Sequence, residues 1–290
     1  MGATRIDGRA LGRDIEDGLS ERISSLAEGG VVPHLAVIIV GNDPASQIYV
    51  RNKQRSCQRI GMISSRIDMK PDTSQSDLIS AVEKLNGDAS VHGILVQSPL
   101  PPGIDELSVI EAIDPRKDVD GFHPVNLGRL VTGDKGGMTP CTPAGVMEII
   151  RRAEVDLEGS RAVVLGRSRI VGMPLSILLA QRGADSTVTI AHSKTESLDE
   201  ICREADILIA AVGKPEMVKS SWIKPGATVI DIGINRIKDD SKDGGTRLVG
   251  DVESGSESIA GIITPVPGGV GPMTIAMLMS NTVLAAERNV

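Results

Sequence analysis

The sequence predicts an α/β fold of two three-layer domains, each a parallel sheet with helices on both faces. Three observations lead to this prediction. Short apolar, β-branched runs alternate with amphipathic stretches along most of the chain. A glycine-containing loop at 166–172 joins one such run to a helix. The length of 290 residues suits about two domains with buried cores. We place the first domain at 1–140, completed by a C-terminal helix at 273–290, and the second at 141–272.

The elements of the first domain follow from the period of its apolar residues. Leu11, Ile15 and Leu19 recur at helical spacing, and glycines at 29 and 30 end that helix. Residues 113–141 are richer in turn formers and are expected to be a crossover. The predicted helices are 7–28, 45–60 and 74–85, and the predicted strands are 33–40, 63–69 and 92–97.

The second domain resumes the alternation after a helix predicted at 142–152. Its strands are expected at 162–165, 186–191, 206–210 and 227–232, and its helices at 173–182 and 196–204. This succession is Rossmann-like. The segment GGVGP at 268–272 predicts a tight loop before the last helix.

The loop after the strand at 162–165 reads GRSRIVG and has the composition of an anion site. Gly166 and Gly172 would let the backbone approach a pyrophosphate, and Pro174 suits the first turn of the following helix. Unpaired N–H groups at the helix start would then face the anion. The spacing is not G-x-G-x-x-G, so an ordinary strand-to-helix turn without an anion site remains an alternative interpretation.

The end of the next strand indicates which dinucleotide this loop would bind. Selectivity for NAD usually requires an acidic residue there, to bind the ribose 2′-hydroxyl. Here the strand leads into His192, Ser193, Lys194 and Thr195, which are donors and cations. Together with Arg167 they suit a 2′-phosphate, which favours NADP. The alternative for Arg167 is a solvent-facing loop arginine.

Composition narrows the range of partners. Lys and Arg total 31 against 38 Asp and Glu, a net charge of −7 that argues against nucleic acid or a membrane surface as the main partner. The N-terminus has no apolar core, so no secretory signal is expected. Cys57, Cys141 and Cys202 are odd in number and widely spaced, as in reduced cytoplasmic proteins. Neither the cysteines nor the four histidines show the spacing of metal ligands.

Candidate chemistry lies on the helix predicted at 45–60. Tyr49 and Lys53 are four residues apart and share one face of it. Gln97 ends a buried strand before a proline-stiffened loop, and Asp118 and Asp120 lie in the turn-rich crossover. A lysine shielded from water in such a place can exchange protons near neutral pH. The simpler interpretation is a surface tyrosine beside a solvated lysine.

Six segments in register resemble the bifunctional methylenetetrahydrofolate dehydrogenase/methenyltetrahydrofolate cyclohydrolase family over nearly the whole chain. Ser98 departs from the pattern, since the family more often has Leu before Pro99, and it could alter the packing of Gln97. We do not expect the family's large formyl-ligase domain in a chain of this length. The segments are YVRNK at 49–53, GILVQ at 93–97, KDVDGF at 117–122, PCTP at 140–143, GRSRIVG at 166–172 and PVPGGVGPMT at 265–274.

The resemblance implies two reactions of one-carbon metabolism. The protein would oxidise 5,10-methylenetetrahydrofolate with NADP and hydrolyse the methenyl product to 10-formyltetrahydrofolate, which serves purine biosynthesis. Folate would lie in a cleft between the two domains, and the protein would be a homodimer in the cytoplasm.

The resemblance also implies roles for individual residues. Lys53 would be the catalytic lysine, held by Gln97, while Asp120 would bind the pterin's amino–amide edge and Tyr49 would stack on the ring. Gly271 and Pro272 would line the benzoyl portion. Further substrate contacts are expected at Val96 and Pro267. The NADP contacts are expected at Gly166, Arg167, Ser168, His192, Ser193 and Ile234.

Two other functions remain as alternatives. Another two-domain NAD(P)-linked dehydrogenase, such as a shikimate-type enzyme, would not explain why Tyr49, Lys53, Gln97 and Asp120 occur together. A non-catalytic NADP-binding regulator would give no turnover with methylenetetrahydrofolate.

Overall fold

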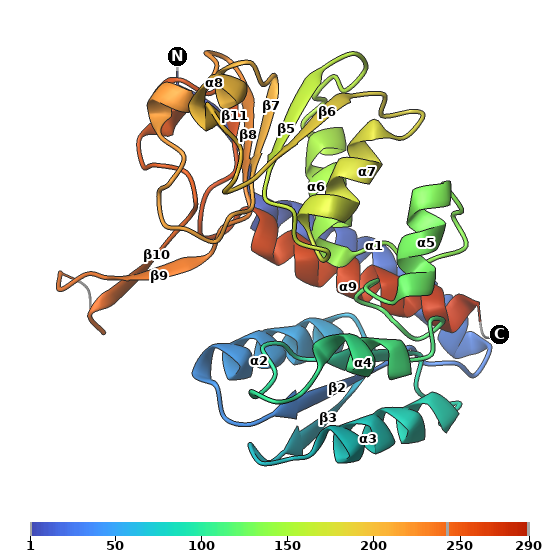
Figure 1. Ribbon diagram of the computed structural model, residues 1–290. Helices are drawn as coiled ribbons and strands as arrows, with labels where there is room; N and C mark the ends of the chain where they lie inside the picture. Colours follow the sequence, from blue (N-terminus) through green and yellow to red (C-terminus); the bar gives the residue numbers. More distant parts are fainter. Residues whose placement is uncertain (1, 242–243, 289–290) are drawn as a thin grey trace. The chain divides into compact units, whose positions relative to one another are not determined.

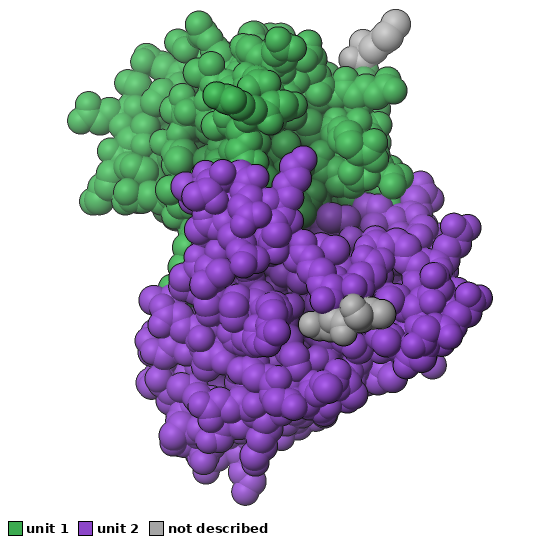
Figure 2. Space-filling model, turned by 90° about the vertical axis from the view of Figure 1, so that its right-hand side faces the viewer, with its two compact units in different colours: residues 1–12, 142–274 green, residues 13–141, 275–290 purple. Residues whose placement is uncertain are grey.

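The computed structural model describes residues 2–241 and 244–288. The chain divides into two compact units, coloured separately in Figure 2. Unit 1 consists of Met1–Gly12 and Thr142–Thr274, and unit 2 of Arg13–Cys141 and Ile275–Val290. Residue 1 and the end of the predicted C-terminal helix, 289–290, lie outside the described residues.

Unit 2 is built on a parallel sheet of order β3-β2-β4. The central strand β2 (His34–Val40) pairs with β3 (Ile63–Met69) and β4 (Gly93–Val96). Side chains of a strand alternate between the two faces of a sheet. Leu35, Val37 and Ile39 therefore pack in one core and Ala36 and Ile38 in another. An all-parallel sheet buried on both faces is the middle of three layers.

Helices cover both faces of this sheet. The core on one face includes side chains of α1, α2 and α9, and the core on the other includes side chains of α3 and α4. The helices of unit 2, drawn in Figure 1, are α2 (Pro44–Arg59), α3 (Gln75–Gly87), α4 (Glu106–Ala112) and α5 (Pro124–Thr132). The boundaries between the units fall inside α1 (Gly8–Glu28), α6 (Cys141–Arg152) and α9 (Val270–Glu287).

Unit 1 contains a parallel sheet of order β1-β11-β8-β7-β5-β6. Val163 and Leu165 of β5 pack with Cys202 of α8 on one face, and α7 packs against β5 and β6. Chain connections leave β5 in opposite directions, toward β6 and then toward β7, so the switch point lies between β5 and β7. The elements are β1 (Thr4–Arg5), β5 (Arg161–Leu165), α7 (Gly172–Ala180), β6 (Thr187–Ala191), α8 (Leu198–Arg203), β7 (Ile207–Ala210), β8 (Thr228–Asp231) and β11 (Ile262–Ile263).

Unit 1 also carries an antiparallel ribbon of β9 (Asn235–Lys238) and β10 (Thr246–Val249). It extends away from the sheet of that unit in Figure 1. Two short 3-10 helices, η1 (Ser220–Trp222) and η2 (Ser256–Ser258), complete the elements. Across the described residues, no helix is both long enough and apolar enough to cross a membrane.

The structure confirms the predicted α/β fold and the Rossmann-like parallel sheet, and it corrects several details. The expected crossover at 113–141 contains α5, which Pro124 and the side-chain cap of His123 begin. The expected loop at 268–272 is shorter, because α9 already begins at Val270. Residues 1–12 group with unit 1, whereas we placed them in the first domain, because β1 pairs with β11. The periodicity also did not predict α4, the ribbon, β1 or β11.

Candidate active site

Lys53 lies on α2, one helical turn after Tyr49. The carboxylate of Asp43 caps this helix by accepting a hydrogen bond from the backbone N–H of Ser46 at 2.7 Å. Val50 points into the core and has no exposed surface, which fixes the orientation of the helix. An adjacent side of the helix carries Tyr49, which is 40% exposed, and Lys53, which is half-buried.

Gln97 directly follows β4 and contacts Lys53. The Nζ of Lys53 donates a hydrogen bond to the Oε1 of Gln97 at 3.0 Å. The Nε2 of Gln97 donates to the carbonyl oxygen of Ser98 at 2.6 Å. Both ends of the amide are therefore engaged, with its oxygen toward the amine. Ser98 holds Gln97 through its main chain, which any residue provides, and its hydroxyl donates instead to Glu106. Val96, the residue before Gln97, is half-buried at the end of β4.

Asp120 lies in the loop between α4 and α5. Burial raises the pKa of its carboxyl to about 6, an effect that the positive charge of Lys53 opposes and the negative charge of Asp118 reinforces. Among the described residues, none donates a hydrogen bond to this carboxylate. Asp120 is thus an acceptor shielded by protein, within the electrostatic reach of Lys53, and available to a ligand.

Asp118, two residues earlier, has the opposite situation. Its side chain is 1% exposed, and it accepts hydrogen bonds from the backbone N–H groups of Gly121, Phe122 and His123 at 2.8–3.3 Å. The Nδ2 of Asn126 donates a fourth at 2.8 Å. The turn-rich composition pointed to both aspartates and only the resemblance gave a role to Asp120; the structure leaves the Asp120 carboxylate without a donor among the described residues, whereas that of Asp118 has four.

The glycine loop of unit 1 lies at the carboxyl end of β5. Gly166 has a φ of +118°, and a Cβ there would lie 2.2 Å from the carbonyl oxygen of Ala211. A Cβ on Gly172 would lie 2.1 Å from the carbonyl oxygen of Gly166. Neither position tolerates a side chain without movement of the backbone. Both glycines are therefore required by the fold of the loop itself.

The N–H groups at the start of α7 are not the free donors that the sequence led us to expect. Those of Val171 and Gly172 donate to the hydroxyl of Ser168, that of Met173 donates to the carbonyl of Ser168, and Pro174 has none. Among the described residues, no acceptor binds the backbone N–H groups of Arg167 or Ser168. An anion at this loop would be bound by the loop's N–H groups and by the Ser168 hydroxyl, which can still donate.

The turn after β6 is ordered by its own residues. The backbone N–H of His192 donates to the hydroxyl of Thr195 at 2.9 Å, and the Nδ1 of His192 accepts from the N–H of Lys194 at 3.2 Å. Ser193 and Lys194 remain exposed. Arg167 is exposed, and its guanidinium makes no hydrogen bond or ion pair to a described residue. Parallel strands bring the ends of β5 and β6 to one edge, so this donor set fits a dinucleotide phosphate.

Four other predicted site residues of unit 1 lie in or near the segment GGVGP at 268–272: Ile234, Pro267, Gly271 and Pro272. Pro267 is exposed in the loop after β11, whereas Gly271 and Pro272 lie in the first turn of α9. Ile234 is 45% exposed, and its Cδ1 lies 3.5 Å from where a Cβ on Gly271 would stand. The structure thus brings Ile234, an expected cofactor contact, against Gly271, an expected substrate contact.

Two buried carboxylates at the ends of strands were not found from the sequence. Asp231, at the end of β8, accepts from the backbone N–H groups of Gly233, Asp251 and Val252, each at 2.9 Å. Burial raises its pKa to about 6. An acidic residue directly after the apolar run ATVI was the available signal.

Asp251 in turn holds the loop that follows β7. It is fully buried, and its carboxylate accepts from the backbone N–H groups of Val212, Gly213 and Lys214 at 2.7–2.9 Å. The Nδ2 of Asn235 donates a fourth hydrogen bond at 2.8 Å. Ala211 directly precedes Val212, and its carbonyl oxygen lies close to Gly166. The hydrogen bonds to Asp251 therefore hold the backbone next to the glycine loop.

No group of three His, Cys, Asp or Glu side chains in residues 2–241 and 244–288 is arranged to hold a metal ion. The three cysteines, all within the described part of the chain, are buried and unpaired. Burial raises the pKa of the Cys57 thiol to about 12, and that of Cys141 well above its ordinary value. Lys53, Gln97 and Asp120 bring an amine, an amide and a carboxylate to the candidate site.

Comparison with protein families decides which family carries this arrangement. Residues 6–120 match the catalytic domain of tetrahydrofolate dehydrogenase/cyclohydrolase, and residues 140–290 match the NAD(P)-binding domain of the same family. The chain belongs to the tetrahydrofolate dehydrogenase/cyclohydrolase family. Lys53, Gln97 and Asp120 fall in the catalytic match, and the glycine loop falls in the NAD(P)-binding match.

Individual members of the tetrahydrofolate dehydrogenase/cyclohydrolase family are similar over the full length. The bifunctional protein FolD of Acetivibrio thermocellus is 54% identical over 289 residues, which cover 99% of this chain and 98% of that protein. The crystal structure of the bifunctional FolD of Campylobacter jejuni superposes with a TM-score of 0.94 at 44% identity, covering 99% of this chain and all of that one.

A further member of the family has been solved with a cofactor bound. The FolD of Trypanosoma brucei, in complex with NADP and an inhibitor, is 41% identical and superposes with a TM-score of 0.94, covering 99% of this chain and 98% of that one. Membership of this family argues against both alternatives, a shikimate-type enzyme and a non-catalytic regulator. The predicted roles of single residues, and a folate cleft between the domains, stay predictions.

Proposed function

We propose that this protein oxidises 5,10-methylenetetrahydrofolate to 5,10-methenyltetrahydrofolate with NADP and hydrolyses the product to 10-formyltetrahydrofolate. The family match over both domains carries the proposal. Three observations support NADP as the cofactor: the NAD(P)-binding match, the NADP held by the relative from Trypanosoma brucei, and the cations and donors at Arg167 and 192–195.

The oxidation depends on positioning more than on an acid or a base. The methylene carbon lies between two folate nitrogens, whose lone pairs stabilise the cation left when hydride departs. NADP, when bound, accepts that hydride. We assign Asp120 to the pterin, because a carboxylate accepts paired hydrogen bonds from an amino–amide edge and no described residue occupies this one. Tyr49 offers a partly exposed ring for stacking, and Val96, Pro267, Gly271 and Pro272 are proposed substrate contacts.

The hydrolysis moves protons at three points. Water forms a bond to the cationic carbon and loses one proton. A ring nitrogen then takes up a proton as its bond to that carbon breaks, and the hydroxyl on the carbon loses its proton as it becomes the formyl carbonyl. We assign these transfers to the Nζ of Lys53; general acid–base catalysis of this kind contributes ~10²–10⁴-fold. An ammonium and a neutral amine both donate hydrogen bonds, so Gln97 can orient Nζ in either protonation state.

Absorbance spectroscopy tests the proposal directly. Methylenetetrahydrofolate and NADP should give NADPH with the purified protein, and methenyltetrahydrofolate should be hydrolysed without any cofactor. A protein that binds NADP but turns over neither folate would be a regulator. One that reduces NADP only with a different substrate would be another dehydrogenase, and either result contradicts the proposal.

We further propose that the protein is a cytoplasmic homodimer that supplies formyl groups for purine biosynthesis. Three unpaired buried cysteines agree with a reducing compartment. Strand β6 is an edge strand of the unit 1 sheet, and an edge offers unpaired backbone groups to a second chain. Light scattering during size-exclusion chromatography should give twice the mass of 30.5 kDa, and a monomer at assay concentration would contradict the dimer.

A further inference from the structure

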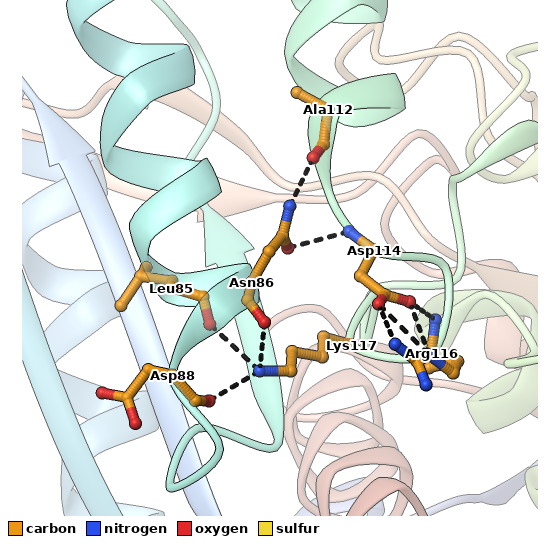
Figure 3. A network of polar contacts seen from close by, with 7 residues as sticks. All are labelled: Leu85, Asn86, Asp88, Ala112, Asp114, Arg116 and Lys117. Atoms are coloured by element: carbon orange, nitrogen blue, oxygen red, sulfur yellow. Dashed lines mark hydrogen bonds and ion pairs between the residues drawn. The ribbon is translucent and has the colours of Figure 1, made fainter.

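Lys117 anchors the loop that carries Asp120. Its Nζ donates hydrogen bonds to the backbone carbonyls of Leu85, Asn86 and Asp88 at 3.0, 2.9 and 2.7 Å, as Figure 3 shows. The last carbonyls of a helix have no partner within it, and a cation there is favourable. The residue is only 7% exposed, and burial lowers its pKa. One ammonium thus ends α3 and holds the loop against it.

The same loop is fixed at its start and to the sheet. The side chain of Asn86 donates to the carbonyl of Ala112 at 2.7 Å and accepts from the N–H of Asp114 at 2.9 Å (Figure 3). The N–H of Ile94, on β4, donates to the carbonyl of Lys117 at 2.8 Å. Lys117 is therefore held by both its main chain and its side chain.

The residues after Lys117 are held just as firmly. The carboxylate of Asp118 accepts hydrogen bonds from the three backbone N–H groups that follow Asp120 in the chain. The Nδ2 of Asn281 and the Sγ of Cys141 both donate to the carbonyl of Val119, at 2.9 and 3.2 Å. The carboxylate of Asp120 is left as the unengaged polar group between these anchors.

We propose that Lys117 and Asp118 are positioning residues that hold Asp120 in place for both folate reactions. This inference rests on the proposed function. Burying two charged side chains in a loop costs desolvation free energy. Apolar residues of similar size would often stabilise the fold equally well. Holding a binding carboxylate at a fixed place is a task that apolar packing performs less well, since a misplacement of about 1 Å can cost about 10²-fold in rate.

Adjacent cations provide a matched pair for the first experiment. Lys117→Met removes the buried ammonium. Arg116→Met removes an exposed cation whose guanidinium pairs, among the described residues, with the side chain of Asp114 alone (Figure 3). We expect Lys117→Met to lower kcat/KM for both folate substrates by about 10–10²-fold, and Arg116→Met to change it by less than twofold. The Kd for NADP should stay constant in both, because the proposed NADP contacts lie in unit 1, and an unchanged far-UV circular dichroism spectrum shows that unit 2 is folded in each variant.

A double-mutant cycle with Asp120→Asn distinguishes positioning from general damage. If Lys117 acts through Asp120, the loss caused by Lys117→Met should largely disappear in the Asp120→Asn background, measured as the Kd for unsubstituted tetrahydrofolate. Equal losses in both backgrounds would overturn the inference.

The pH profile provides a readout that a merely structural role would not move. The charged groups that act on Asp120 are Lys53 on α2 and Asp118 in its own loop, and Asp120 in turn raises the pKa of the Cys141 thiol at the start of α6. Burial is the main cause of the raised pKa of Asp120, and the negative charge of Asp118 adds to it. Asp118→Asn removes that charge, so the acidic limb of kcat/KM should move to lower pH. A lower melting temperature with an unmoved limb contradicts the inference for Asp118.

Failure of the inference and failure of the proposed function give different results. If the wild-type protein turns over neither folate, the proposed function is wrong. If the wild type is active and Lys117→Met matches Arg116→Met, the function stands and Lys117 is not a positioning residue.

Discussion

Lys53 and Gln97 are joined by a hydrogen bond of 3.0 Å between Nζ and Oε1. The hydrogen bond links α2 to the segment after β4, and the two residues that it joins are 44 positions apart in the chain. Because the Gln97 Nε2 is bound to the carbonyl of Ser98, the amide cannot turn its nitrogen toward the amine without losing both contacts. The orientation of Lys53 is thus set by its neighbour, and its chemistry can be tested separately from its charge.

The two activities should separate at Lys53. Departure of hydride requires no protein base, so Lys53→Met should retain measurable NADP reduction but lose hydrolysis by about 10²-fold or more. Lys53→Arg keeps the cation and cannot lose a proton at neutral pH, so it should fail as badly if Nζ exchanges protons. Coupled absorbance assays with Lys84→Met, an exposed lysine on α3, as control measure both rates. Full hydrolysis by the Met variant would exclude a catalytic role.

Asp120→Asn should stabilise the protein at neutral pH while it impairs both activities. The pKa of Asp120 is raised from 3.8 to about 6 in the folded protein. The folded state thus binds a proton more tightly than the unfolded chain, and that stabilisation is complete below about pH 4 and lost as the pH rises through about 6. At about pH 7.5 the variant should unfold with about 1–3 kcal/mol more free energy than the wild type, and the difference should shrink toward pH 4.

Urea unfolding of both proteins at several pH values measures this difference. Asp118→Asn is the matched comparison, since it leaves buried N–H donors unpaired and should be destabilising at every pH. A wild type that is more stable than Asp120→Asn at neutral pH would show that the charged carboxylate is not strained there.

Arg167→Ala should weaken NADP much more than NAD. The guanidinium is exposed at the end of β5, and only NADP carries the 2′-phosphate that it would bind. A hydrogen bond to a charged group contributes about 1.5–3 kcal/mol, so the Kd for NADP should rise about 10–10²-fold. Arg182→Ala, an exposed arginine just beyond α7, is the control. Equal losses for both cofactors in titration calorimetry would argue against a 2′-phosphate role.

Asp251→Asn should destabilise unit 1 and weaken NADP binding together. An asparagine would turn an N–H group toward backbone donors at one of its two positions, and each unsatisfied buried group costs about 1–3 kcal/mol. The loop after β7 would loosen beside Gly166, where Ala211 is in close contact. Asp240→Asn removes an exposed carboxylate that pairs with Lys238 and should change neither property. Unchanged melting of Asp251→Asn would contradict the prediction.

Features that depend on neighbouring residues could be predicted from the sequence. The period of the apolar residues predicted the longer strands of both sheets and most of the helices that cover them, because burial of one face imposes that period wherever the element lies in the fold. The four-residue spacing of Tyr49 and Lys53 likewise placed them on one face of α2. The predictions failed for α5, which is short and contains Gly128, and for β1 and β11, whose two residues have no measurable period.

The sequence by itself determined which acidic residues are present, including the pair Asp118 and Asp120 in the loop before α5 and the pair Asp231 and Asp251 at or just after strand ends. Only the tertiary structure decided that Asp118 and Asp251 are occupied by backbone N–H groups, whereas Asp120 is not. Only the tertiary structure decided that the Lys117 ammonium ends a helix that precedes it by some 30 residues. The physical reason is that these partners come from distant segments. Which donors and acceptors pair depends on which buried groups the fold brings together, and this cannot be deduced from residue type and spacing.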